Sequence, residues 1–186
     1  SAIDLSGYTD ESVAVFADAL ETATAVLSKE DATQSEIDKA ASGLNSASNK
    51  LVERIDPVTV SGSGADVVEI PSNLAVCLVE ARHNGGSNFS IWSLDSNMEN
   101  IDLLVNTIGT YSGTTTTGMG RGTSQYLEVE GDGEWTITMS PLSEAHQLEN
   151  GEQRSGDDVV FMDASSAKKL DIVNDGESNF SIWAFT

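Results

Sequence analysis

The sequence predicts an α+β protein in two parts, an N-terminal helical hairpin over residues 1–56 and an antiparallel β-sandwich over residues 57–186. Three observations lead to this fold class. Apolar residues recur at helical spacing as far as Ile55, and short segments with alternating apolar residues replace them after Pro57. A segment of the β-region also occurs twice, which indicates an internal duplication.

Two apolar stripes, with members three or four residues apart, define the hairpin. The first stripe consists of Val13, Phe16, Leu20, Ala23 and Leu27. The second consists of Ile37, Ala40, Leu44, Ala47, Leu51 and Ile55. Between the stripes, Thr33 and Glu36 have the spacing of a capping box, in which each residue satisfies a free N–H group of the other. We therefore expect two antiparallel helices joined by a loop at residues 28–32.

The same residues carry a family resemblance. The motifs are Tyr8-x-x-x-Ser12, Phe16-Ala17-x-Ala19-Leu20-x-x-Ala23, Ala32-Thr33-Gln34, Ile37-Asp38-x-Ala40 and Leu44-x-x-Ala47-x-x-x-Leu51. This first third of the chain resembles a FIVAR module, a short helical unit of bacterial cell-wall and secreted proteins. The resemblance implies an extracytoplasmic, multidomain parent protein in which the unit is often a spacer beside carbohydrate-active or adhesive domains. It implies no catalytic residues.

Short strands separated by Gly, Asn, Asp and Ser make up the rest of the chain. We expect strands at 58–61, 66–70, 74–82, 88–94, 101–107, 125–130, 134–139, 158–162, 169–173 and 179–185. Residues 130–134 have the composition of a hairpin turn, so the apolar residues of the two strands around it should face one core. About ten strands without intervening helices are typical of an antiparallel sandwich. The region resembles uncharacterised domains of secreted actinobacterial and other Gram-positive proteins through NFSIW and residues 103–113, a resemblance that implies no particular function.

The duplicated segments lie around residues 64–92 and 156–183. SNFSIW ends at Trp92 and again at Trp183, and GADVV at 64–68 is echoed by GDDVV at 156–160. Six consecutive identities that include Phe and Trp indicate related structure. We expect the two units to occupy equivalent positions in the two halves of the sandwich.

The charge excludes two classes of partner. Thirty acidic residues stand against nine basic ones, a net charge of −21, and no basic tract exists. Nucleic acids and anionic lipid surfaces both require basic residues, so neither is expected to bind, and no apolar stretch is long enough to enter a membrane. The lone Cys77 lies in an apolar run and is expected to be a buried thiol. With the FIVAR resemblance, we expect an extracellular or cell-wall location, with the targeting segments outside this sequence.

The sequence offers little catalytic chemistry, and we expect a protein that is not an enzyme. His83 and His146 lie in different segments, no Gly-x-Ser-x-Gly elbow is present, and no cluster has zinc spacing. His83 is better explained as a turn residue that bonds the backbone. We expect no cofactor. A structural calcium ion at Asp95–Glu99 stays an alternative, although an EF-hand loop fails because Asn100 and Asn106 occupy its required Gly and Glu positions.

The two repeated tryptophans are the candidate ligand-binding residues. Strand alternation places Phe89 and Ile91 on one face and Trp92 on the other, so an outward Trp92 could stack on a sugar ring. The candidate site residues are Trp92, Trp183, Tyr111, Asn88 and Asn179. They favour a non-catalytic binding or adhesion module, with a glycan or another host or cell-wall component as partner. The alternatives are tryptophans that are simply covered, and a structural spacer that presents other domains. The oligomeric state is left open.

Overall fold

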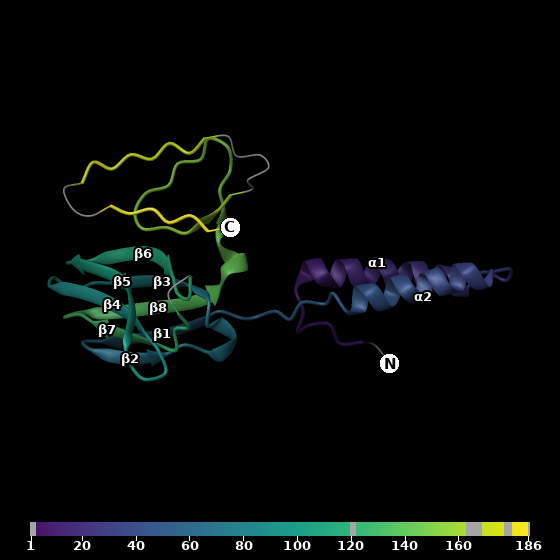
Figure 1. Ribbon diagram of the computed structural model, residues 1–186, viewed down its shortest axis with the longest axis horizontal. Coiled ribbons are helices and arrows are strands. Elements are labelled where there is room, and N and C mark those ends of the chain that lie inside the picture. Colours follow the sequence, from purple (N-terminus) through teal and green to yellow (C-terminus); the bar gives the residue numbers. More distant parts are fainter. Residues whose placement is uncertain (1–2, 120–121, 163–168, 177–179, 186) are drawn as a thin grey trace. The chain divides into compact units, whose positions relative to one another are not determined.

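A computed structural model describes residues 3–119, 122–162, 169–176 and 180–185 of the chain. The chain forms two compact units, residues 1–54 and residues 55–186 (Figure 1). The first unit contains two helices, and the second contains antiparallel sheets that pack as a sandwich. The predicted α+β fold class is therefore confirmed.

The first unit is a hairpin of α1 (Asp10–Leu27) and α2 (Gln34–Ser48). The predicted capping box starts α2, because the Thr33 hydroxyl accepts a hydrogen bond from the Glu36 N–H and the Glu36 carboxylate accepts one from the Thr33 N–H. Lys29 closes the loop with a 2.7 Å ion pair to Glu36. The hydrogen bond from Lys29, with those from Thr33, lowers the pKa of Glu36 to about 2.

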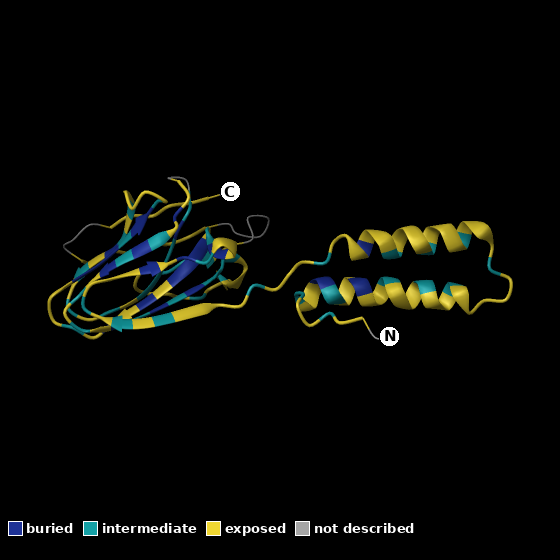
Figure 2. Cartoon of the chain, turned by 90° about the horizontal axis from the view of Figure 1, so that it is seen from below, coloured by how far each residue is buried: buried dark blue, intermediate teal, exposed yellow. Residues whose placement is uncertain are grey.

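Backbone pairing joins the two chain segments at the open end of the hairpin. Tyr8 and Glu53 form an antiparallel bridge, and the Thr9 N–H donates to the Val52 carbonyl at 2.8 Å. The apolar stripes are buried only toward this end, where Phe16 and Ala47 lie in the interior (Figure 2). Leu20, Leu27 and Ile37, predicted as parts of the stripes, are exposed because two helices alone provide no third element to cover them.

The second unit contains two four-stranded antiparallel sheets. The Trp92 sheet has the strand order β2 (Asp66–Glu69), β7 (Tyr126–Glu130), β4 (Asn88–Leu94) and β5 (Asn100–Ile108). The Trp135 sheet has the order β1 (Val58–Ser63), β8 (Glu134–Pro141), β3 (Cys77–His83) and β6 (Tyr111–Thr116). The turns β1–β2, β3–β4, β5–β6 and β7–β8 each join one sheet to the other.

The core lies between the two sheets and follows the predicted alternation. Its buried apolar residues are Val68, Ile70, Leu74, Cys77, Val79, Ala81, Phe89, Ile91, Val105, Leu127, Val129, Trp135, Ile137 and Met139. The turn at residues 131–133 is present, but β7 and β8 do not pair as a hairpin, because they belong to opposite sheets. Their apolar residues face the same core from opposite sides. A hairpin within one sheet and a turn between two sheets give the same apolar pattern, so the sequence does not distinguish them.

Five elements of the described residues differ from the sequence prediction. The strand β6 was not predicted, because an edge strand of the sequence YSGTTT has no apolar alternation. Short 3-10 turns occur at Ser72–Leu74 and Leu142–Glu144. β9 (His146–Gln147) pairs in parallel with β10 (Val160–Phe161), a two-residue remnant of the strand expected at 158–162.

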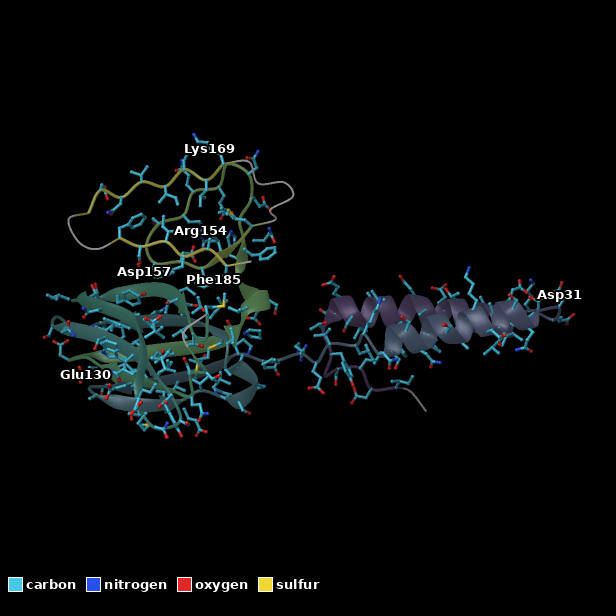
Figure 3. The ribbon with its side chains drawn as sticks, viewed as in Figure 1. Asp31, Glu130, Arg154, Asp157, Lys169 and Phe185 are labelled. Carbon is cyan, nitrogen blue, oxygen red and sulfur yellow. The ribbon has the colours of Figure 1, made fainter. Side chains whose placement is uncertain are left out.

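The largest departure concerns the duplication. We call residues 64–94 the first copy, and the described residues 156–162, 169–176 and 180–185 the second copy. The first copy supplies β2, β3 and β4, whereas the described second copy forms only β10. Lys169 and Phe185 lie on segments without strands (Figure 3). The expectation of equivalent positions is therefore wrong for the described residues, because a strand needs hydrogen-bonded neighbours and the second copy lacks the partners that the first copy has.

Candidate ligand-binding face

β4 lies inside the Trp92 sheet, where it is paired on both sides. Ile91 pairs with Val105 of β5 and points into the core, as predicted. The next pair is Trp92 with Leu103, so Leu104 is an extra residue that forms a β-bulge. Trp92 is half-buried and does not belong to the core, which places its indole on the outer face of the sheet.

Trp92 lies in a row of four residues that crosses the whole outer face. Val67 pairs with Glu128, Glu128 pairs with Trp92, and Trp92 pairs with Leu103. Residues directly opposite each other share a face with Cβ atoms about 5 Å apart, so these side chains are neighbours. Val67 and Leu103 are 42% and 38% exposed. The row is therefore an apolar strip open to solvent, with one carboxylate beside the indole.

Polar groups border this strip on one side. In the adjacent row, Ser90 pairs with Glu130 of β7 and with Asn106 of β5. Glu130 and Asn106 are exposed, and Asn88 is an exposed residue farther along β4. Amide and carboxylate groups beside a flat aromatic ring can bind a polyhydroxylated ligand, because they hydrogen-bond to hydroxyls while the ring contacts the apolar side of the sugar.

Tyr111 is engaged in the structure of the sandwich. Its ring packs against the core and contacts Phe89 with a centroid distance of 5.8 Å. Its hydroxyl donates a 2.9 Å hydrogen bond to the Asp157 carboxylate. Burial and the charge of Asp157 both raise the pKa of Tyr111. The Thr114 N–H also donates to the Asp157 carbonyl, so Tyr111 helps to attach the start of the second copy to β6.

The remaining candidates lie in the second copy. Trp183 is 68% exposed but lies outside any strand, so the alternation predicted around it does not exist. Asn179 is outside the described residues. Trp92 and Asn88 share β4, whereas Tyr111 belongs to the opposite sheet. The structure thus places the two repeated tryptophans in different environments, and only Trp92 is fixed on a sheet.

A buried polar cluster at the turns was only partly foreseen from the sequence. His83 is buried and stacks on Phe89 with a centroid distance of 4.3 Å. As expected, it bonds the backbone, because Nδ1 contacts the Gly109 carbonyl at 2.9 Å and Nε2 accepts from the Gly133 N–H at 3.2 Å. These contacts require the proton on Nδ1. The 3.6 Å approach of Asp132 to Nε2 is then no ion pair, since that lone pair already accepts the Gly133 N–H.

Asp132 completes this cluster. Its carboxylate accepts hydrogen bonds from the Ser87 and Gly86 N–H groups, which lie in the turn before β4. The hydrogen bond from Ser87 is the main cause that lowers the pKa of Asp132. The cluster therefore fixes the start of β4 to the β7–β8 turn. The signal in the sequence was the pair of Gly-rich turns, but nothing in it showed that they meet.

At Asp95–Glu99, the position considered for a calcium ion, the Asp95 carboxylate makes hydrogen bonds within the turn. The Asp95 carboxylate accepts hydrogen bonds from the N–H groups of Asn97 at 2.8 Å and Glu99 at 2.9 Å. These bonds, that from Glu99 first, lower the pKa of Asp95. Among the described residues, no three His, Cys, Asp or Glu side chains gather in a way that could hold a metal ion. Asp95 therefore closes the β4–β5 turn with its own oxygens.

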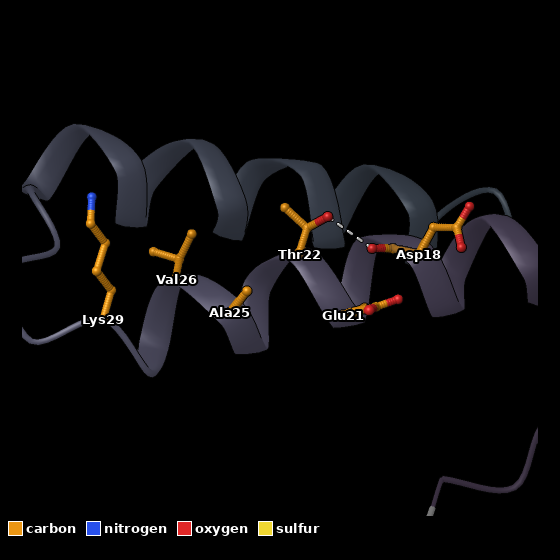
Figure 4. Close-up of a pocket in the computed structure, with 6 residues that line it drawn as sticks. All are labelled: Asp18, Glu21, Thr22, Ala25, Val26 and Lys29. Carbon is orange, nitrogen blue, oxygen red and sulfur yellow. Dashed lines mark hydrogen bonds between the residues drawn. The ribbon is translucent and has the colours of Figure 1, made fainter.

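The helical unit has a hollow of its own. It has a volume of about 590 Å³ and is lined by Asp18, Glu21, Thr22, Ala25, Val26 and Lys29 (Figure 4). The Thr22 hydroxyl is turned back onto the Asp18 carbonyl of the same helix at 2.9 Å. This hollow is widely open to solvent.

Comparison with known proteins finds a family match in the helical unit. Residues 2–52 match the FIVAR domain. The match spans both helices of what we now call the FIVAR hairpin, and FIVAR domains occur in bacterial surface proteins. No curated protein and no solved structure matches the chain. In the part of the chain that the structure describes, neither helix has the length and apolar character needed to cross a membrane.

Proposed function

We propose that this chain is a non-catalytic binding module of a bacterial cell-surface or secreted protein, and that the outer face of the Trp92 sheet binds a glycan. The observation that supports this is the solvent-open row through Trp92, bordered by Glu130, Asn106 and Asn88. An aromatic ring fixed on a central strand stacks on a sugar without losing much side-chain freedom, which favours binding.

The charge of the sandwich narrows the class of glycan. Residues beyond Pro57 carry nineteen acidic and five basic side chains, and Glu128 lies directly beside Trp92. Sulfated or carboxylated sugars would be repelled by this field. A neutral glycan, whose hydroxyls can donate hydrogen bonds to carboxylates, is the ligand class that suits the face. The FIVAR match supports an extracellular or cell-wall location for the module.

The alternative is a spacer that presents other domains and binds nothing. One observation weighs against a spacer made by the FIVAR hairpin. Because Tyr8 pairs with Glu53, the chain enters and leaves the hairpin at the same end. The 18 residues of α1 extend for about 27 Å, but they return through α2 and so add little separation between the two chain ends. A stalk needs elements that separate its ends.

A glycan array tests the proposal on the intact chain, with calcium and with a chelator. The variants are Trp92→Ala, Trp92→Phe and, as the matched control, Trp183→Ala. We expect binding of neutral glycans by the wild type, loss of at least about tenfold with Trp92→Ala as a stacked aromatic is removed, and partial retention with Trp92→Phe. Trp183→Ala should bind like the wild type.

Each outcome decides between the two functions. Loss with Trp92→Ala in a protein that still unfolds cooperatively supports binding at the Trp92 sheet. Equal binding by Trp92→Ala and wild type would place the ligand elsewhere and overturn the site. No binding by the wild type in either buffer favours the spacer. Binding that disappears only with chelator would add a calcium ion to the site.

A further inference from the structure

The second copy keeps the core-facing pattern of the first although it forms no sandwich. The two copies are offset by 91 residues across β3 and β4. Core residues correspond to apolar residues of the second copy as follows: Val79 to Leu170, Ala81 to Ile172, Phe89 to Phe180 and Ile91 to Ile182. Phe89 and Ile91 are 0% exposed, while Phe180 and Ile182 are 53% and 55% exposed. The second copy thus has the apolar residues of a core-facing strand, but Phe180 and Ile182 are exposed to solvent.

The missing partners can be named from the first copy. β2 pairs with β7, β3 pairs with β6 and β8, and β4 pairs with β5 and β7. All of these partners belong to β5–β8, which follow the first copy in the sequence. The matching segments correspond to β2–β4, so this sequence contains two sets of those three strands and one set of their partners. The described second copy is therefore exposed because its partners are already paired with the first copy.

We propose that the second copy is the β2–β4 part of a second sandwich with the same topology. Its exposed apolar face binds a segment of the β5–β8 type, supplied C-terminally in the same polypeptide. The first copy obtains its partner strands from the same chain, because β5 follows β4 after the short turn Asp95–Glu99 and pairs with it. We expect the second copy to obtain its partners in the same way. A second molecule is a poorer source, because its β5–β8 segment already covers its own Phe89 and Ile91.

Completion would move Trp183 to the position that Trp92 has in the first sandwich, next to a counterpart of Glu128. A chain of this kind would carry two outer faces of the same design, one for each copy. That last step alone rests on the proposed function, since it assigns the faces a glycan. The fold proposal is independent of it.

The test supplies the missing strands from the chain itself. Residues 95–150 are joined after Phe185, so that the new junction reproduces the natural one between Leu94 and Asp95. Hydrogen exchange read by mass spectrometry follows residues 169–176 and 180–185, whose flanking sequences distinguish them from β3 and β4. We expect exchange there to slow by at least about 100-fold on extension, as amides enter a sheet, and Trp183 emission to shift to the blue.

The matched control is the same extended chain with Phe180→Asp and Ile182→Asp, in which the second copy should exchange as fast as in the unextended protein while β4 stays protected. Fast exchange of the second copy in the extended wild type would overturn the proposal. Protection gained only while β4 loses its own would show strand replacement and also overturn it. Protection of the unextended chain that rises with dimer formation in light scattering would make a second molecule the partner.

Discussion

The two copies of SNFSIW show how one sequence takes two structures. In β4 the motif is an interior strand, with Phe89 and Ile91 in the core and Trp92 on the outer face. In the second copy Phe180, Ile182 and Trp183 are all exposed and lie in no strand. The local sequence is the same, so the difference comes from the neighbours. Cross-strand pairing and the opposite sheet stabilise β4, whereas the described residues 180–185 of the second motif form no strand.

The turns before the two motifs differ in the same way. Before β4, Asp132 and His83 bind the turn to residues of two other turns. Before the second motif, the Gly176 N–H donates to the Asn174 side chain at 3.1 Å, a contact between residues two apart. Long-range contacts thus fix the turn before β4, while the contact described for the turn before the second motif is local.

The sharpest test of this comparison removes the same side chain from both copies. Phe89→Ala deletes a fully buried ring that stacks on His83, so we expect it to destabilise the sandwich by about 3–5 kcal/mol. Phe180→Ala removes a ring that is mostly solvated and should change the free energy of unfolding by less than about 0.5 kcal/mol. Urea unfolding read by Trp fluorescence measures both. Equal costs would mean that the second copy is packed.

A glycine pair tests the turns. An added Cβ at Gly85 would lie 2.5 Å from His83 Nε2 and would contact Asp132, so Gly85→Ala should destabilise the sandwich by about 1–3 kcal/mol. At Gly176 the nearest atom to such a Cβ is the Asn174 side-chain oxygen at 3.3 Å. Gly176→Ala should therefore change the urea midpoint little. A tolerated Gly85→Ala would contradict the packing of His83 against this turn.

A substitution in the FIVAR hairpin lies outside both copies and tests a contact that is local in sequence. Thr33→Ala removes the hydroxyl that accepts the Glu36 N–H, and loss of an N-cap costs about 1 kcal/mol. Circular dichroism should show the helices melting at a lower temperature. Thr33→Ser keeps the hydroxyl and serves as control. Unchanged melting of Thr33→Ala would show that the capping box adds no stability.

The smallest effect is expected from pH. Backbone hydrogen bonds lower the pKa of Asp132 in the folded protein below its ordinary value of 3.8. Its contribution to stability is therefore complete above about pH 4 and is lost as the pH falls through the folded pKa. Between pH 6 and pH 3, the urea midpoint of Asp132→Asn should fall less than that of the wild type. Parallel curves for the two proteins would remove Asp132 from this role.

The local part of the structure could be predicted from the sequence. The two helices and the Thr33–Glu36 capping box depend on residues within a few positions of each other, so their pattern is visible in the chain. The inward positions of Phe89 and Ile91 follow from strand alternation. For the candidate site, the same alternation identified Trp92 as an outward residue. Strand alternation could not identify Val67, Glu128 and Leu103 as members of the Trp92 row, because the pairing register depends on two strands together.

Which segments find partners depends on contacts between distant parts of the chain. Six identical residues predicted two equivalent strands, yet one set of β5–β8 strands can pair with only one copy at a time. Contacts between distant segments also place β7 and β8 in opposite sheets and bring His83 to Gly109 and Gly133. The local sequence pattern shows which residues are able to form helix, strand and core. Partners distant in the chain decide which of these segments actually become strands, because burial and pairing supply the free energy that stabilises a strand.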